Sequence, residues 1–326
     1  MSLQFRYAVI LVIILGFAAC NDDISVIYPG PPVPVVYGVF DVNDPVHYVK
    51  LTKSFVGEED PRELAAAHGN VFYDGARIYL YRYSDTDRAY FELKDSLVRD
   101  TGYFPQLPNE AYVLNKKLSA GYYLLNIQLP DSGDTLSARF AIIDALKVLL
   151  PKAGFKRFYF YEDPTVFAWM PHPGAGLYEL SFILTYQESL KSGEKYNRTV
   201  RFNRQLKPEI LEFSLDRYVY RYYSDAFFAY IGTQVLKNEE VDYRKAVNLD
   251  IEITAVDTTL ARYINWYTME IDDKINPNGN VSGAIGVIGS KYTVSFPGLS
   301  LSNRSQDSLI KGRYTRDLGF VSNSQW

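Results

Sequence analysis

The feature that most constrains the fold is a series of short segments in which apolar and polar side chains alternate. Segment 76–83 reads Ala-Arg-Ile-Tyr-Leu-Tyr-Arg-Tyr. In a strand, Ala76, Ile78 and Leu80 would lie on one face. Arg77, Tyr79 and Tyr81 would lie on the other face. Similar segments, separated by turn residues, cover 35–40, 47–55, 118–129 and 135–143. Side chains alternate between the two faces of a strand, and many short strands with turns between them indicate a β-sandwich. The fold class predicted is therefore mainly β, with an N-terminal Ig-like or transthyretin-like β-sandwich over residues 35–145.

The second half mixes strand and helix patterns. Segments 177–186 and 197–202 predict a β-hairpin with its tip at 191–194. Apolar residues then recur at helical spacing after Ser224, which predicts a helix that ends near Asn238. A second helix is predicted to begin at Thr258 or Thr259. We therefore expect residues 146–326 to form a second β-rich domain with one or two helices.

The N-terminus predicts export and lipid anchoring. Arg6 precedes an apolar run over 8–19, and the only cysteine of the chain, Cys20, follows two small residues. The run is shorter than the roughly 20 residues that a spanning helix needs, and a basic start with an apolar middle is typical of a signal peptide. This segment resembles a bacterial lipoprotein signal, which predicts cleavage of residues 1–19 and acylation of Cys20. The proline-rich stretch 20–34 is expected to be an extended tether.

Composition excludes several classes of protein. The formal net charge of the whole chain is −4, and removal of residues 1–19 takes away only Arg6, leaving about −5. This mild acidity argues against nucleic acid as a partner. A single cysteine leaves no intramolecular disulfide and no zinc site built on several thiolates. The 28 tyrosines fit exposed β-sheets better than a dedicated binding surface.

Catalytic and metal-binding patterns are weak throughout. His47, His68 and His172 have no metal-ligand spacing, and we expect them at surface or turn positions. No Gly-x-Ser-x-Gly occurs, and the glycines between Gly279 and Gly289 lack the lysine of a phosphate loop. Those glycines predict turns or close backbone packing instead. The sequence therefore predicts a non-enzyme without cofactor or metal, in which the acidic groups at 58–60 and 272–273 are solvated surface rather than calcium ligands.

Two kinds of short motif resemble signals of Bacteroidota. Asn21, Asp22 and Asp23 follow the cysteine directly and resemble the export signal that sends lipoproteins to the outer face of the outer membrane. The alternative is a solvated linker. Four Asp-Ser or Asp-Thr motifs, which begin at Asp95, Asp134, Asp257 and Asp307, resemble O-glycan acceptor sites.

The folded part resembles a family as well. Segment 34–50, Pro-Val-Val-Tyr-Gly-Val-Phe-Asp-Val-Asn-Asp-Pro-Val-His-Tyr-Val-Lys, and the glycine-rich segment 279–290 resemble Bacteroidota lipoproteins of the domain of unknown function 4249 group. That group often has phenylalanine where Ile288 follows Val287 here. The resemblance implies a lipid-anchored, β-rich envelope protein, often encoded near outer-membrane transporters. It implies no catalytic residues.

Two functional hypotheses follow. The first is a non-enzymatic, surface-exposed lipoprotein that is an accessory or interaction module of an outer-membrane complex for transport, secretion or motility. The alternative is a glycan- or peptide-binding adhesin, in which Trp169, Trp266 and Tyr267 stack on a sugar. Core packing is the competing interpretation for each of these aromatic residues.

Overall fold

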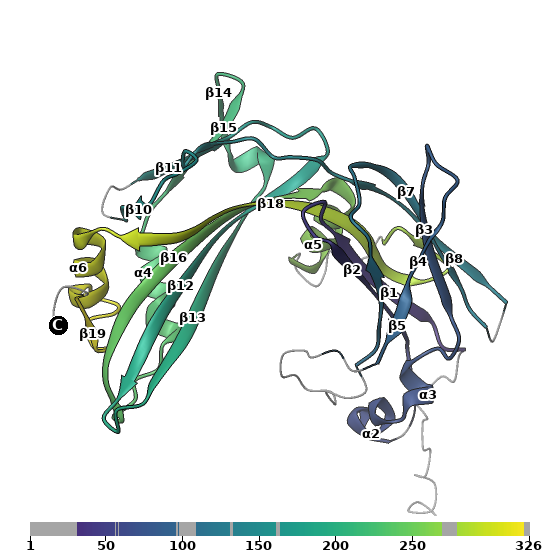
Figure 1. Cartoon of the computed structure of the whole chain (residues 1–326), viewed down its shortest axis with the longest axis horizontal. Coiled ribbons are helices and arrows are strands. Elements are labelled where there is room, and N and C mark those ends of the chain that lie inside the picture. The colour runs from purple at the N-terminus through teal and green to yellow at the C-terminus, as the bar shows by residue number, and fades with distance from the viewer. Residues whose placement is uncertain are drawn as a thin grey trace, which may run out of the picture.

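The computed structural model describes residues 31–55, 57, 59–95, 97, 109–130, 133–160, 164–268 and 279–322. The chain is mainly β, as predicted, and its strands form several sheets. Figure 1 shows an N-terminal half and a C-terminal half as the two sides of an arch. Strand β18 (Ile285–Leu301) crosses from one half to the other.

The N-terminal half is a sandwich of two sheets. One layer holds β1, β2, β6 and β5 beside β18, and the other has the order β17-β8-β7-β3-β4. Its helices are α2 (Pro61–Ala66) and α3 (His68–Val71). Its strands are β1 (Pro34–Phe40), β2 (Val46–Lys53), β3 (Arg77–Arg82), β4 (Ala89–Tyr90), β5 (Glu92–Lys94), β6 (Ala111–Asn115), β7 (Gly121–Gln128), β8 (Thr135–Ile142) and β17 (Val281–Ser282).

The C-terminal half places the long strands β13, β12, β16 and β18 opposite a sheet of order β14-β15-β11-β9. Its strands are β9 (Val148–Leu150), β10 (Arg157–Phe158), β11 (Thr165–Trp169), β12 (Ala175–Leu190), β13 (Lys195–Leu206), β14 (Glu212–Ser214), β15 (Arg217–Tyr222), β16 (Val241–Asp257) and β19 (Phe320–Val321). Its helices are the 3₁₀ turn η1 (Pro208–Ile210), α4 (Asp225–Gln234), α5 (Thr258–Thr268) and α6 (Asn303–Lys311).

Each half has its own apolar core. The C-terminal core is aromatic: Phe160 stacks on Phe227 of α4 with ring centroids 4.6 Å apart, and Phe182 of β12 contacts both rings. The N-terminal core is formed by residues of 36–142 together with Val281 and Ile288. The predicted domain boundary near residue 145 stays a prediction, and these two residues belong to the N-terminal core although they come from far down the chain.

Strand β18 is shared by both halves. Its first part pairs in parallel with β1, from Val35↔Ile285 to Phe40↔Ser290, and its later part pairs antiparallel with β16, from Val256↔Lys291 to Leu249↔Leu299. One sheet of ten strands therefore extends through both sandwiches.

The glycines of β18 permit this close packing, as the sequence predicted. Gly286 has φ +123°, and a Cβ there would lie 1.9 Å from the carbonyl oxygen of Val36 on β1. A Cβ at Gly289 would lie 2.7 Å from Cβ of Leu260, so helix α5 can lie directly on the strand only because position 289 has no side chain.

Asp257 and Ser290 hold the junction of the two halves. The Asp257 carboxylate caps α5 by accepting from the backbone N–H of Thr259 at 2.7 Å, and it also accepts from the N–H of Ser290. The Ser290 hydroxyl donates to the carbonyl of Ala141 at 2.7 Å and accepts from the N–H of Ile143 at 3.1 Å. Burial raises the pKa of Asp257, and the backbone donors offset part of that rise.

Candidate interaction surface

The residues predicted to anchor the chain lie outside the described residues. This holds for Cys20, for the export motif Asn21, Asp22 and Asp23, and for the predicted leader 1–19. Among the helices of the described ranges, none is both long enough and apolar enough to cross a bilayer. Membrane attachment through Cys20 stays a prediction.

Three exposed apolar side chains lie at or next to the β14–β15 hairpin, and one of them, Leu215, has the largest exposed fraction among the large apolar side chains of the described residues. Phe213 is 61% exposed and Leu215 81% exposed, and Ile210 of the preceding turn η1 is 57% exposed. Figure 1 shows this hairpin projecting from the C-terminal half. Apolar side chains of this size are seldom left in water together without a partner, so the tip is a candidate contact surface.

The backbone of the tip is strained at a leucine. Leu215 and Asp216 have φ values of 52° and 58°, and they form the two-residue turn between Ser214 and Arg217. Turns of this kind favour Asn-Gly, because positive φ costs a residue with a Cβ roughly 1–2 kcal/mol. A leucine there is unfavourable both for the backbone and for hydration, which makes Leu215 a candidate contact residue.

A chain of aromatic contacts supports the hairpin from below. Phe213 contacts Tyr218 edge-on at 5.7 Å between ring centroids, and Tyr218 contacts Tyr178 at the same distance. Tyr178 in turn packs at 5.3 Å on Trp169, which is fully buried. The exposed tip is therefore connected to the C-terminal core by rigid rings.

The tip lies far from the point where the tether joins the fold. Pro34 at the start of β1 pairs with Lys53, whose ammonium donates to the carbonyl of Gly69 in α3 at 3.1 Å. Figure 1 shows α3 at the end of the molecule opposite the β14–β15 hairpin.

A second apolar surface lies on the outer face of β1 and β2. Tyr37, Val39 and Tyr48 are exposed there, together with Ile285 of β18. Helix α5 covers the neighbouring Val287, and the hydroxyl groups of Tyr37 and Tyr263 are 2.8 Å apart. This face is partly covered by its own chain, so it is the weaker candidate.

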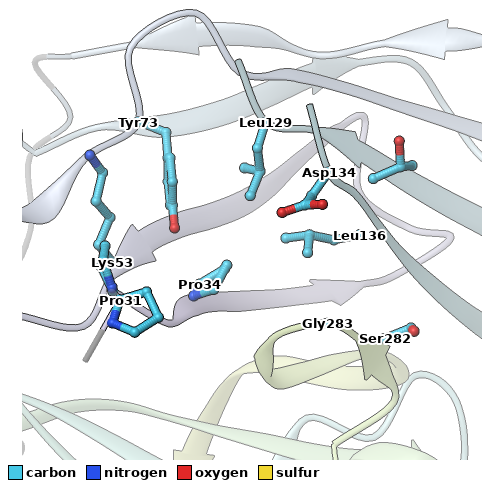
Figure 2. A pocket seen from close by; sticks show the side chains of 11 residues that line it. Pro31, Pro34, Lys53, Tyr73, Leu129, Asp134, Leu136, Ser282 and Gly283 are labelled. Atoms are coloured by element: carbon cyan, nitrogen blue, oxygen red, sulfur yellow. The ribbon is translucent and has the colours of Figure 1, made fainter. Parts of the chain in front are cut away.

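A pocket of about 410 Å³ opens at the tether end of the N-terminal sandwich. Its walls come from the start of β1, the end of β2 and the start of β8, and Ser282 and Gly283 close one side. Figure 2 shows Lys53, Tyr73 and Asp134 around the same space as Leu129 and Leu136. The volume suits a small ligand, but Pro31 and Pro34 line the pocket, so its shape depends on the tether.

The histidines occupy three different settings, and the expectation of surface or turn positions is wrong for His47. His47 is 1% exposed in β2, because its strand position faces the core, where it stacks on Phe40. His68 contacts the carboxylate of Glu110. His172 accepts from the N–H of Gly174 at its Nδ1 atom, so Nε2 carries the proton and donates to Asp144 at 2.5 Å. Within the described ranges, no three histidine, cysteine, aspartate or glutamate residues gather as metal ligands.

Other predicted positions are now placed. Trp169 packs in the core, which removes it from sugar stacking, and the side chains of Trp266 and Tyr267 lie outside the description. In the glycan-like motifs, Thr135 and Thr258 are exposed and Ser308 is half-buried on α6, whereas Ser96 is outside the described residues.

Comparison with known proteins adds little. No protein-family model and no curated protein matches the chain. Among solved structures it resembles InvD of Yersinia pseudotuberculosis, with 11% sequence identity over 71% of this chain and a TM-score of 0.15. The match spans 66% of that chain, slightly less than two thirds of it. A likeness at this level supports no inference, and the resemblance to the domain of unknown function 4249 group stays a prediction.

Proposed function

We propose that this chain is a non-enzymatic lipoprotein of the outer membrane, anchored through Cys20, that binds another envelope protein through the β14–β15 hairpin. The observation that carries the proposal is the exposed Leu215 at positive φ, flanked by Phe213 and Ile210. Hot spots of protein interfaces are few, large and rigidly held side chains, and the ring contacts beneath Phe213 meet that description.

The location of the hairpin also supports a protein partner above the membrane. A tether that enters beside α3 leaves the opposite end of the molecule free for contact with a transporter or with a secretion or motility complex. In this arrangement the acyl chains of Cys20 supply attachment and the hairpin supplies recognition.

The proposal is tested by co-purification from membranes of the native host. A Phe213→Ser variant should lose a partner that the wild-type chain retains, because the exposed ring is replaced by a small polar group. The control is Leu236→Ser, which removes a still more exposed apolar side chain, 77% accessible, outside the hairpin. Equal recovery of the partner with Phe213→Ser and wild type would refute a contact at the hairpin.

The anchor is tested separately with Cys20→Ala. We expect the folded domains to remain intact and the protein to leave the membrane fraction, since removal of the thiol prevents acylation. Mass spectrometry of the native protein should find the leader removed and the cysteine acylated. Retention of the variant in membranes would contradict the anchor.

A further inference from the structure

The edge of the large sheet formed by β13 is open. Among the described residues, β13 pairs with β12 along its length and has no strand on its other side. β13 is 12 residues long, whereas strands in globular proteins average about 5–6 residues. An edge of this kind presents a row of N–H and C=O groups that a further strand can pair with.

This edge is also strongly basic. Segment 195–207 contains five basic residues and no acidic residue, within a chain whose net charge is −4. The basic residues are Lys195, Arg198, Arg201, Arg204 and Lys207. The side chains of Arg198 and Arg201 are 56% and 44% exposed. Positive charge is therefore concentrated along one edge of an otherwise acidic molecule.

The charges of the edge are only partly neutralised. Arg201 pairs with Glu252 at 2.6 Å. Arg198 lies 4.0 Å from Glu188, a carboxylate that is already held by the buried Arg244 at 2.9 Å. In the part of the chain that the structure describes, no carboxylate lies within 4.0 Å of Lys195, Arg204 or Lys207.

We propose that β13 binds an acidic, extended segment of another protein, which adds to the sheet as a further strand. Main-chain hydrogen bonds would give this contact its geometry, and carboxylates on the added strand would pair with the arginines and lysines of β13. A second copy of this chain fits poorly, because two such edges would bring like charges together.

An anionic membrane or lipopolysaccharide surface could neutralise the basic residues of β13, but it offers no row of backbone hydrogen-bond donors and acceptors. The open ladder therefore favours a polypeptide. The proposal goes beyond the function proposed above, because β13 belongs to the opposite sheet of the C-terminal half from β14 and β15. Substitutions in the hairpin should leave binding at β13 unchanged.

The test uses the full mature chain and a fluorescent decapeptide in which pairs of glutamate alternate with pairs of valine, with binding followed by anisotropy. Both faces of the added strand then carry glutamate, as both faces of β13 carry basic residues. We expect saturable binding that weakens as salt is raised, because exposed ion pairs are screened. Two control peptides separate the contributions. One has the same side chains with alternate backbone nitrogens methylated, and the other has lysine in place of glutamate. Neither control should bind.

The matched variants reverse charge on and off the edge. Lys195→Glu combined with Arg204→Glu should weaken binding by about tenfold or more, since two attractions become repulsions. Neither residue makes an ion pair in the described chain, so circular dichroism should show an unchanged fold. Lys94→Glu, in β5 of the other half, should leave binding as in wild type.

Three results would overturn the proposal. The first is equal binding of the methylated peptide, which would show that charge alone is recognised. The second is capture of the protein by phosphatidylglycerol vesicles that the Lys195→Glu, Arg204→Glu variant loses, which would assign the edge to membrane. The third is absence of acidic-peptide binding at low salt.

Discussion

His47 lies against Phe40 inside the N-terminal core, with ring centroids 5.3 Å apart. Neither ring nitrogen makes a well-formed hydrogen bond to a described residue, although the backbone of Lys116 lies near enough to favour the charged form slightly. Burial is the larger effect and lowers the pKa of His47 below its ordinary value of 6.5. Protonation of His47 is therefore linked to the folding equilibrium.

The sign of that coupling gives the first prediction. Because the pKa of His47 is lower in the folded chain, the unfolded chain takes up the proton first as the pH falls below 6.5. His47 thus costs stability on the acid side and nothing above that pH. His47→Leu should flatten the decline in the free energy of unfolding between pH 6.5 and acid pH, measured by urea unfolding. An unchanged pH dependence would show that the ring is solvated.

Leu215 gives a prediction in which stability and binding change in opposite directions. Leu215→Asn should raise the free energy of unfolding by about 1 kcal/mol, because asparagine tolerates positive φ better than leucine. The same variant should lose partner protein in co-purification. Leu236→Asn, at an exposed position without positive φ, is the control for stability and should change it little. A Leu215→Asn variant that is less stable than wild type would contradict the strain argument.

At the scale of elements, the local signals were sufficient for most strands and helix starts. Asp60 caps α2 at Pro61, and the helix predicted after Ser224 is α4, although it ends earlier, at Gln234. The predicted 191–194 tip connects β12 to β13. Helix α6 was not predicted, although Ser302 accepts from the N–H of Ser305 as an N-cap residue does.

What the sequence could not reveal is which elements meet. The pairing of β1 with β18 joins residues 250 positions apart, from Val35↔Ile285 to Phe40↔Ser290, and nothing in either segment specifies the partner. For the same reason, the sequence shows that basic residues recur over 195–207, but it does not show that this segment forms an open sheet edge. Likewise, the sequence does not show that the side chains of Phe213 and Leu215 are exposed.

The pairing of β1 with β18 can be tested at Gly286. Gly286→Ala should lower the free energy of unfolding by more than about 2 kcal/mol, because its Cβ would overlap the Val36 carbonyl and its φ of +123° disfavours any other residue. The control is Gly154→Ala, whose φ is +79° but which has open space around it. Because no atom would crowd a Cβ at Gly154, this control measures only the free-energy cost of the positive φ. Equal losses for the two variants would mean that β1 and β18 are not in close contact.

At the scale of the whole molecule, the shared strand couples the two halves. Leu125 is fully buried in the N-terminal core, whereas the aromatic core lies in the other half. Since β18 pairs with β1 in one half and with β16 in the other, unfolding of one half should disturb the strand pairing of the other. We expect one cooperative unfolding transition rather than two.

Leu125→Ala tests this expectation. It should destabilise the protein by about 2–5 kcal/mol and lower the urea midpoint equally for amides of β7–β8 and of β12–β16, measured by hydrogen exchange. Leu93→Ala, at an exposed site in β5, is the control and should shift neither midpoint. A fall confined to β7–β8 would show that the halves unfold independently.

The contribution of β17 and the start of β18 to the first sandwich has a consequence for the order of folding during synthesis. A chain that emerges from its N-terminus presents β1 to β8 long before Val281 and Ile288 arrive to fill that core. The first half therefore cannot form its complete core while the remainder is still being synthesised. Late synthesis of Val281 and Ile288 therefore keeps the N-terminal core incomplete until most of the chain has been made.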